Sequence, residues 1–165
     1  MALPAAEPRR ILLRPLGIEM ARAVLGNDRQ LDWSPGYPTE GDRDISRFLT
    51  DRPPPPEVPE LFLPYQIVIA RVGTVAGGIG CHRPPDGTGT VEIGYGIAPE
   101  WRNRGLTTEA VQLLVGMLRS GGVGKVTART APANLPSQSV LRNAGFYFSG
   151  AGDDGFVLWE LALRP

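Results

Sequence analysis

The chain has 165 residues, enough for one domain with its own core, and its 17 basic residues balance its 17 acidic residues. A neutral chain lacks the positive charge that attracts duplex nucleic acid or an anionic membrane surface, so we expect neither as a partner. The single cysteine, Cys81, excludes an internal disulfide, and the single histidine, His82, cannot complete a metal site with it, so we expect no metal.

The first half of the chain predicts short helices among strands. Residues 1–10 lack the apolar core of a signal peptide and no apolar run could cross a bilayer, which predicts a cytoplasmic protein. A strand is expected at 9–16, a helix at 18–25, and a second short helix with Asp42 as its N-cap. The proline-rich segment 52–60 reads better as a rigid loop within one domain than as a partner-recognition motif.

The remaining elements alternate between strands and helices. Strands at 63–72 and 75–83 form a hairpin through Gly73, and a turn-rich loop leads into a strand at 91–97. The elements that follow are a helix at 104–119, a strand at 125–130, a helix at 135–145 and a final hairpin over 145–163. This order indicates a mixed α/β fold in a single domain, residues 1–165.

Positive charge and a glycine gather where the 104–119 helix begins. The first N–H groups of a helix lack partners and attract anions, and Gly105 removes a Cβ where a ligand would approach. Arg102 and Arg104 oppose the helix dipole unless an anion binds there, and Thr107 and Thr108 add hydroxyl donors. A phosphate or pyrophosphate fits this start, although solvated surface arginines are the simpler alternative.

These residues resemble the coenzyme A pyrophosphate loop of the GCN5-related N-acetyltransferases (GNAT family), Q/R-x-x-G-x-G/A. Arg102 and Gly105 fill their places, and Thr107 departs from the pattern. The TEA that follows, residues 108–110, resembles the ribosomal-protein N-terminal acetyltransferase branch, which is RimJ/RimL-like. Residues 134–146, NLPSQSVLRNAGF, resemble the N-x-x-S…GF segment of the family. The order of elements from 9 to 164 agrees as well.

The resemblance implies a GNAT fold, with a central mixed and largely antiparallel sheet and helices on both faces. The sheet would splay between two parallel central strands, 91–97 and 125–130, and acetyl-CoA would enter that gap as co-substrate. The amides of the cofactor would pair with the free edge of the first of these strands near Gly96 and Ile97, and a backbone N–H there would polarise the thioester carbonyl. The implied cofactor-binding residues are Gly96, Ile97, Arg102, Asn103, Arg104, Gly105, Leu106, Thr107, Thr108 and Asn134.

Glu92 is the candidate catalytic base, because it alternates with Val91 and Ile93 and shares a face with Gly94 and Gly96. The resemblance implies the same role for a glutamate at this place in the strand. The alternative is a structural glutamate that pairs with an arginine across the sheet. His82 and Tyr95 are weaker candidates.

The proton donor is less defined. Relatives often have a tyrosine four residues before the glycine of the GF pair, where this chain has Leu141. Ser137, Ser139 or water would then protonate the leaving thiol, or it would leave unassisted as a thiolate. Ser137 has an alternative role as the cap of its own helix.

The acceptor pocket is expected from the N-terminal helices, the last hairpin and the loop 31–42, in which Trp33 and Tyr37 offer apolar walls. Anchoring that loop to the core is the alternative for these aromatic residues. The sequence therefore predicts an N-acetyltransferase that acts on a small amine or a peptide N-terminus. The alternative is a non-catalytic acyl-CoA-binding module, and a homodimer is left open.

Overall fold

The computed structural model describes residues 8–163, so the predictions made for residues 1–7 and 164–165 lie outside the described part of the chain. Its strands are β1 (Ile11–Pro15), β2 (Tyr65–Ile69), β3 (Thr74–Cys81), β4 (Thr90–Ile97), β5 (Lys125–Thr130), β6 (Tyr147–Ala151) and β7 (Val157–Ala162). Its helices are α1 (Ile18–Leu25), α2 (Glu40–Asp51), α3 (Leu106–Ser120) and α4 (Leu135–Asn143), with short 3-10 turns η1 (Glu60–Phe62) and η2 (Pro99–Trp101).

The strands form one seven-stranded mixed sheet in the order β1-β2-β3-β4-β5-β7-β6. Every neighbouring pair is antiparallel except β4 and β5, which are parallel. This parallel pairing joins only Thr90–Glu92 to Lys125–Thr127, and the remainder of β4 has no partner on that side among residues 8–163. The predicted mixed fold, with a sheet that splays between two central parallel strands, is confirmed.

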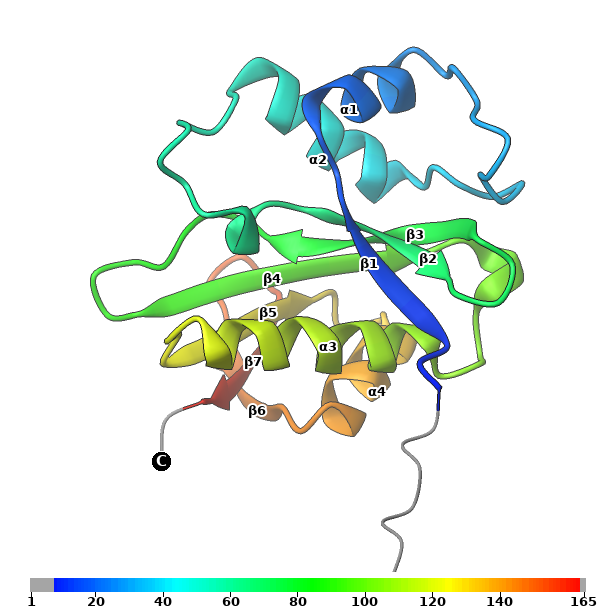
Figure 1. Cartoon of the computed structure of the whole chain (residues 1–165). Helices are drawn as coiled ribbons and strands as arrows, with labels where there is room; N and C mark the ends of the chain where they lie inside the picture. Colours follow the sequence, from blue (N-terminus) through cyan, green and yellow to red (C-terminus); the bar gives the residue numbers. More distant parts are fainter. Residues whose placement is uncertain (1–7, 164–165) are drawn as a thin grey trace, which may run out of the picture.

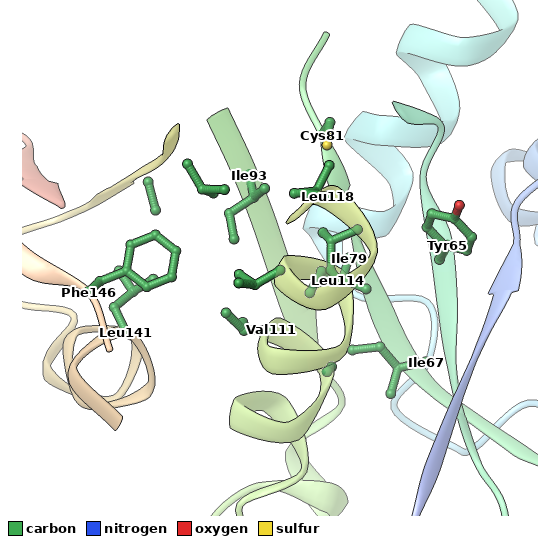
Figure 2. Packing of buried hydrophobic residues seen from close by; sticks show 14 of the residues in the cluster. Tyr65, Ile67, Ile79, Cys81, Ile93, Val111, Leu114, Leu118, Leu141 and Phe146 are labelled. Atoms are coloured by element: carbon green, nitrogen blue, oxygen red, sulfur yellow. The ribbon is translucent and has the colours of Figure 1, made fainter. Parts of the chain in front are cut away.

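Helices cover both faces of the sheet: α1 and α2 lie on one side, and α3 and α4 lie on the other (Figure 1). The main core lies between the sheet and α3, whose apolar residues face the sheet. In Figure 2, Val111, Leu114 and Leu118 of α3 project among Ile79 of β3 and Ile93 of β4. Burying each of these side chains contributes about 1.5–3 kcal/mol, which fixes α3 against the end of β4.

Two helix starts differ from the prediction. The N-cap of α2 is Thr39, and Asp42 is its N3 residue, whose carboxylate accepts the Thr39 N–H in a reciprocal capping box. The α3 helix begins at Leu106 and not at Arg104, because Gly105 adopts the left-handed conformation with φ 73°. Arg102 and Arg104 therefore lie in the turn before the helix. Hydrogen bonds from side chains to the backbone hold the chain in this turn.

The prediction for the proline-rich segment agrees with the structure. The proline-rich segment links α2 to η1 as a loop within the same fold. The small residues of β3 allow close packing: a Cβ on Gly78 would overlap Asp42 of α2, and one on Gly80 would lie 2.7 Å from Pro64 Cα. No helix within residues 8–163 combines the length and the apolar character needed to cross a membrane.

Candidate active site

The start of α3 is an uncapped helix end. The first intrahelical bond runs from the Glu109 N–H to the Gly105 carbonyl at 3.1 Å, and no side chain in the described part of the chain caps the preceding N–H groups. By contrast, Thr39 caps α2 and Asn134 caps α4. The free N–H groups of residues 106–108 therefore form a site that favours an anion.

Arg10, just before β1, stabilises the start of α3, a role that the sequence did not reveal. Its Nε donates to Glu109 Oε2 at 2.8 Å, and its Nη1 donates to the Arg104 carbonyl at 2.9 Å. The two bonds tie the first turn of α3 to the turn before it. Because the strand and the helix are far apart in sequence, no local pattern predicts this contact.

The two arginines of the turn lie exposed and are held by the backbone around them. The Arg104 guanidinium lies over the Trp101 ring at 5.0 Å and donates to the Glu100 carbonyl at 3.0 Å. Arg102 Nε donates to the Ile97 carbonyl at 3.4 Å. Neither arginine forms an ion pair with a described residue, so both charges are available to an anion at the helix start.

A cavity of about 830 Å³ opens beside this turn, between β4 and α4. All ten residues predicted to bind the cofactor line it, and so does Ser137. Among the residues that sequence reasoning did not include in the cofactor set, Tyr95, Trp101, Leu135, Pro136, Ser139, Val140 and Asn143 complete the lining. We call this space the cofactor cavity.

The exposed edge of β4 follows from its register with β3. The His82 N–H donates to the Glu92 carbonyl at 2.9 Å, and the Ala98 N–H donates to the Ala76 carbonyl at 2.7 Å. Bonded positions alternate along an antiparallel pair, so Gly96 directs its backbone polar groups to β3. Tyr95 and Ile97 direct theirs toward the gap. Of the two residues expected at this edge, only Ile97 presents its backbone there.

The first turn of α4 closes the other side of the cofactor cavity. The Asn134 side chain accepts the Ser137 N–H at 3.2 Å, so Asn134 caps the helix and Ser137 does not. The Tyr95 hydroxyl donates to the Ser137 carbonyl at 3.0 Å. Burial raises the pKa of Tyr95 well above its ordinary value, which keeps the phenol protonated at neutral pH. Leu141 is fully buried in the core.

Glu92 lies in a cluster of charged side chains across β3, β4 and β5. Its Oε1 accepts from Arg129 Nε at 3.2 Å and lies 2.9 Å from His82 Nδ1. Arg129 also donates to Asp154 Oδ2 at 2.6 Å. The alternative of an arginine pair across the sheet is thus present in the structure, together with a contact to His82 that sequence reasoning did not foresee.

The imidazole of His82 lies across Gly94, because a Cβ built on Gly94 would be 2.6 Å from His82 Nε2. Glu92 therefore contacts one ring nitrogen while the other lies over a residue without a side chain. Cys81, the neighbouring residue, points to the opposite face, into the core under α3 (Figure 2). Burial raises the pKa of Cys81 to about 12, so this thiol is not a nucleophile at neutral pH.

A second cavity, of about 280 Å³, lies between α2 and the faces of β3 and β4. His82 and Tyr37 line it, whereas Trp33 does not and is buried in a separate cluster against Tyr37 and Val75. We call it the acceptor cavity. Tyr95 and Gly96 line both this cavity and the cofactor cavity, so both spaces border the part of β4 that does not pair with β5.

Comparison with known proteins places this geometry in a family. Residues 10–147 match the family model described as an acetyltransferase (GNAT) domain. The chain is 31% identical over 158 residues to the uncharacterized N-acetyltransferase YjdG of Bacillus subtilis (strain 168), covering 85% of this chain and 88% of that protein.

Solved structures share the fold. A GNAT-family acetyltransferase from Bacillus anthracis superposes with a TM-score of 0.65 at 20% identity, covering 95% of this chain and 97% of that one. Mycobacterium smegmatis RimJ in complex with CoA-disulfide gives a TM-score of 0.62 at 21% identity, covering 92% and 81%. The chain is therefore a GCN5-related N-acetyltransferase, a member of the GNAT family.

Proposed function

We propose that the protein binds acetyl-CoA in the cofactor cavity and transfers the acetyl group to a primary amine held in the acceptor cavity. The observation that carries this proposal is that Tyr95 and Gly96 line both cavities, in the part of β4 that does not pair with β5. A thioester reaching along the free edge of β4 would meet the amine there. The proposed acceptor is a small amine or a peptide N-terminus, and the protein is proposed to act in the cytoplasm.

The start of α3 fits the pyrophosphate of coenzyme A. The uncapped N–H groups of residues 106–108 and the charges of Arg102 and Arg104 suit a doubly charged anion. Gly105 keeps the approach open, since only Arg10 Nη2, at 3.4 Å, lies close to the place of a Cβ. The bound acetyl-CoA supplies an activated acetyl thioester. The Tyr95 or Ile97 N–H at the gap would polarise its carbonyl.

The chain must take one proton from the amine as the new C–N bond forms and the C–S bond breaks. We propose that His82 Nε2, on the wall of the acceptor cavity, accepts it. Glu92, the predicted base, would then act through His82, because its carboxylate holds Nδ1 and stabilises the imidazolium. Ser137 or Tyr95 in the cofactor cavity would protonate the departing thiolate, or solvent would do so.

A non-catalytic acyl-CoA-binding module on the same fold is the second candidate. Its one specific support is Leu141, which fills the place of a tyrosine donor and is buried beyond reach of the cavity. Tyr95 weakens this support, since its hydroxyl supplies a protonated phenol to the same space.

The test is the release of free thiol from acetyl-CoA in the presence of a panel of amines, with the acetylated product identified by mass. Catalysis predicts thiol release that depends on both amine and protein. An increase in melting temperature with acetyl-CoA but no turnover across α-amino, alkylamine and peptide acceptors would support the binding module. Absence of any effect of acetyl-CoA would contradict both candidates.

A further inference from the structure

The acceptor cavity carries negative charge and no fixed positive charge. Asp42 and Asp44 of α2 line it, and no lysine or arginine appears among the described residues that do so. Its volume, about 280 Å³, lies just below the range of about 300–1,000 Å³ typical of sites for drug-sized ligands. These two properties suit a compact cation, and they oppose an acceptor that carries a carboxylate.

Asp42 presents one carboxylate oxygen to this space without a partner. Its Oδ2 accepts the Thr39 N–H at 2.8 Å and the Thr39 hydroxyl at 2.7 Å, which completes its capping role. Its Oδ1 accepts no hydrogen bond from any residue within 8–163, and it lies directly over Gly78 of β3. The residue is only 7% exposed.

A carboxylate that is largely buried and has one oxygen open to a cavity can accept a hydrogen bond from a ligand there. The capping box needs only Oδ2, and an uncharged asparagine would serve as well there. Burial outweighs the Thr39 hydrogen bonds and the charge of Arg43 and raises the pKa of Asp42 above its ordinary 3.8. A cationic group of a ligand would supply the missing partner.

We propose, on the basis of the proposed acetyl transfer, that the acceptor is a compact diamine whose second ammonium group binds Asp42 Oδ1. The reacting amine would lie beside His82, over Gly94, while the ammonium lies over Gly78. Gly78 and Gly94 are diagonal neighbours, since Gly94 pairs with Gly80, and such positions are about 7–8 Å apart. A short carbon chain spans this separation.

The first experiment compares 1,4-diaminobutane with butylamine, which has the same carbon chain and one amine. For the wild-type protein we expect KM to be about 10–100-fold lower for the diamine, the effect of one charge-assisted hydrogen bond. Asp42→Asn should abolish this preference while it keeps an oxygen for the cap. Asp51→Asn, on the same helix but outside the cavity lining, is the matched control and should retain the preference.

Three outcomes would overturn the inference: equal KM values for the two amines, an unchanged preference in Asp42→Asn, or turnover of an alanine-ended peptide but not of the diamine. If Asp42→Asn does not fold, the wild-type comparison still decides. Calorimetric titration of 1,4-diaminobutane into the protein separates this inference from the proposed function. Binding that requires Asp42, without turnover, would refute acetyl transfer and retain the diamine site.

Discussion

Gly105→Ala tests the proposed anion-binding site at the start of α3. Gly105 has φ 73°, a left-handed conformation that costs a residue with a Cβ about 1–2 kcal/mol. The new methyl group would lie 3.4 Å from Arg10 Nη2, close to an ordinary contact, so the backbone conformation accounts for most of the effect. If the turn relaxes when no ligand is bound, CoA binding should weaken by about 5–30-fold.

The assay is calorimetric titration with CoA, combined with urea unfolding of both proteins. If the surrounding contacts hold the turn in place, the same 1–2 kcal/mol should appear as a lower free energy of unfolding. Gly116→Ala is the matched control, because this residue lies within α3 and no atom lies within 4 Å of the place of its Cβ. This control should leave CoA binding unchanged and stabilise the protein by about 0.4–1 kcal/mol. Equal CoA affinity and equal stability in Gly105→Ala and the wild type would contradict the proposed anion-binding site at the start of α3.

Glu92→Gln should lower turnover about 100-fold and change the pH–rate profile without altering CoA affinity, because it removes the charge beside His82; an unchanged profile would exclude Glu92 from the reaction. Gly94→Ala should lower kcat at least about tenfold with little change in melting temperature, because the new Cβ displaces His82 Nε2; full activity would contradict the role of His82. Asn134→Ala should cost about 0.5–2 kcal/mol in urea unfolding through loss of the α4 cap; equal stability would show that this cap is dispensable. Burial raises the pKa of Asp42 above its ordinary 3.8. At pH values just above 3.8, the native state therefore binds more protons than the unfolded chain, and the free energy of unfolding contributed by this group falls as pH rises. Asp42→Asn should remove that contribution from urea unfolding measured across pH, and an identical pH dependence would argue against a raised pKa.

The order of the elements could be predicted because each carries its own local signal. Apolar periodicity identified α3, and alternation along residues 91–97 identified β4 and the face of Glu92. The residues around Gly105 combine charge, glycine and a helix start in one short stretch, so a local pattern was enough to select the residues proposed to bind the cofactor. All ten line one cavity.

The acceptor side could not be predicted because it depends on register and on contacts between distant segments. His82 reaches Glu92 only through the pairing of β3 with β4, and Arg129 reaches it only through β5. Asp42 was expected to be a helix cap and instead faces a cavity, because the cap lies three residues earlier. Of the two roles considered for Trp33, a pocket wall and an anchor of its loop, the structure shows the anchor, buried in another cluster.

A crystal structure of the protein with CoA would place the cofactor against these residues. We expect the pyrophosphate within hydrogen-bond distance of the N–H groups of residues 106–108, and the sulfur beside Tyr95, which lines both cavities. Coenzyme A bound elsewhere, or no density for it in the gap beside β4 at saturating concentration, would contradict the proposed site of acetyl transfer.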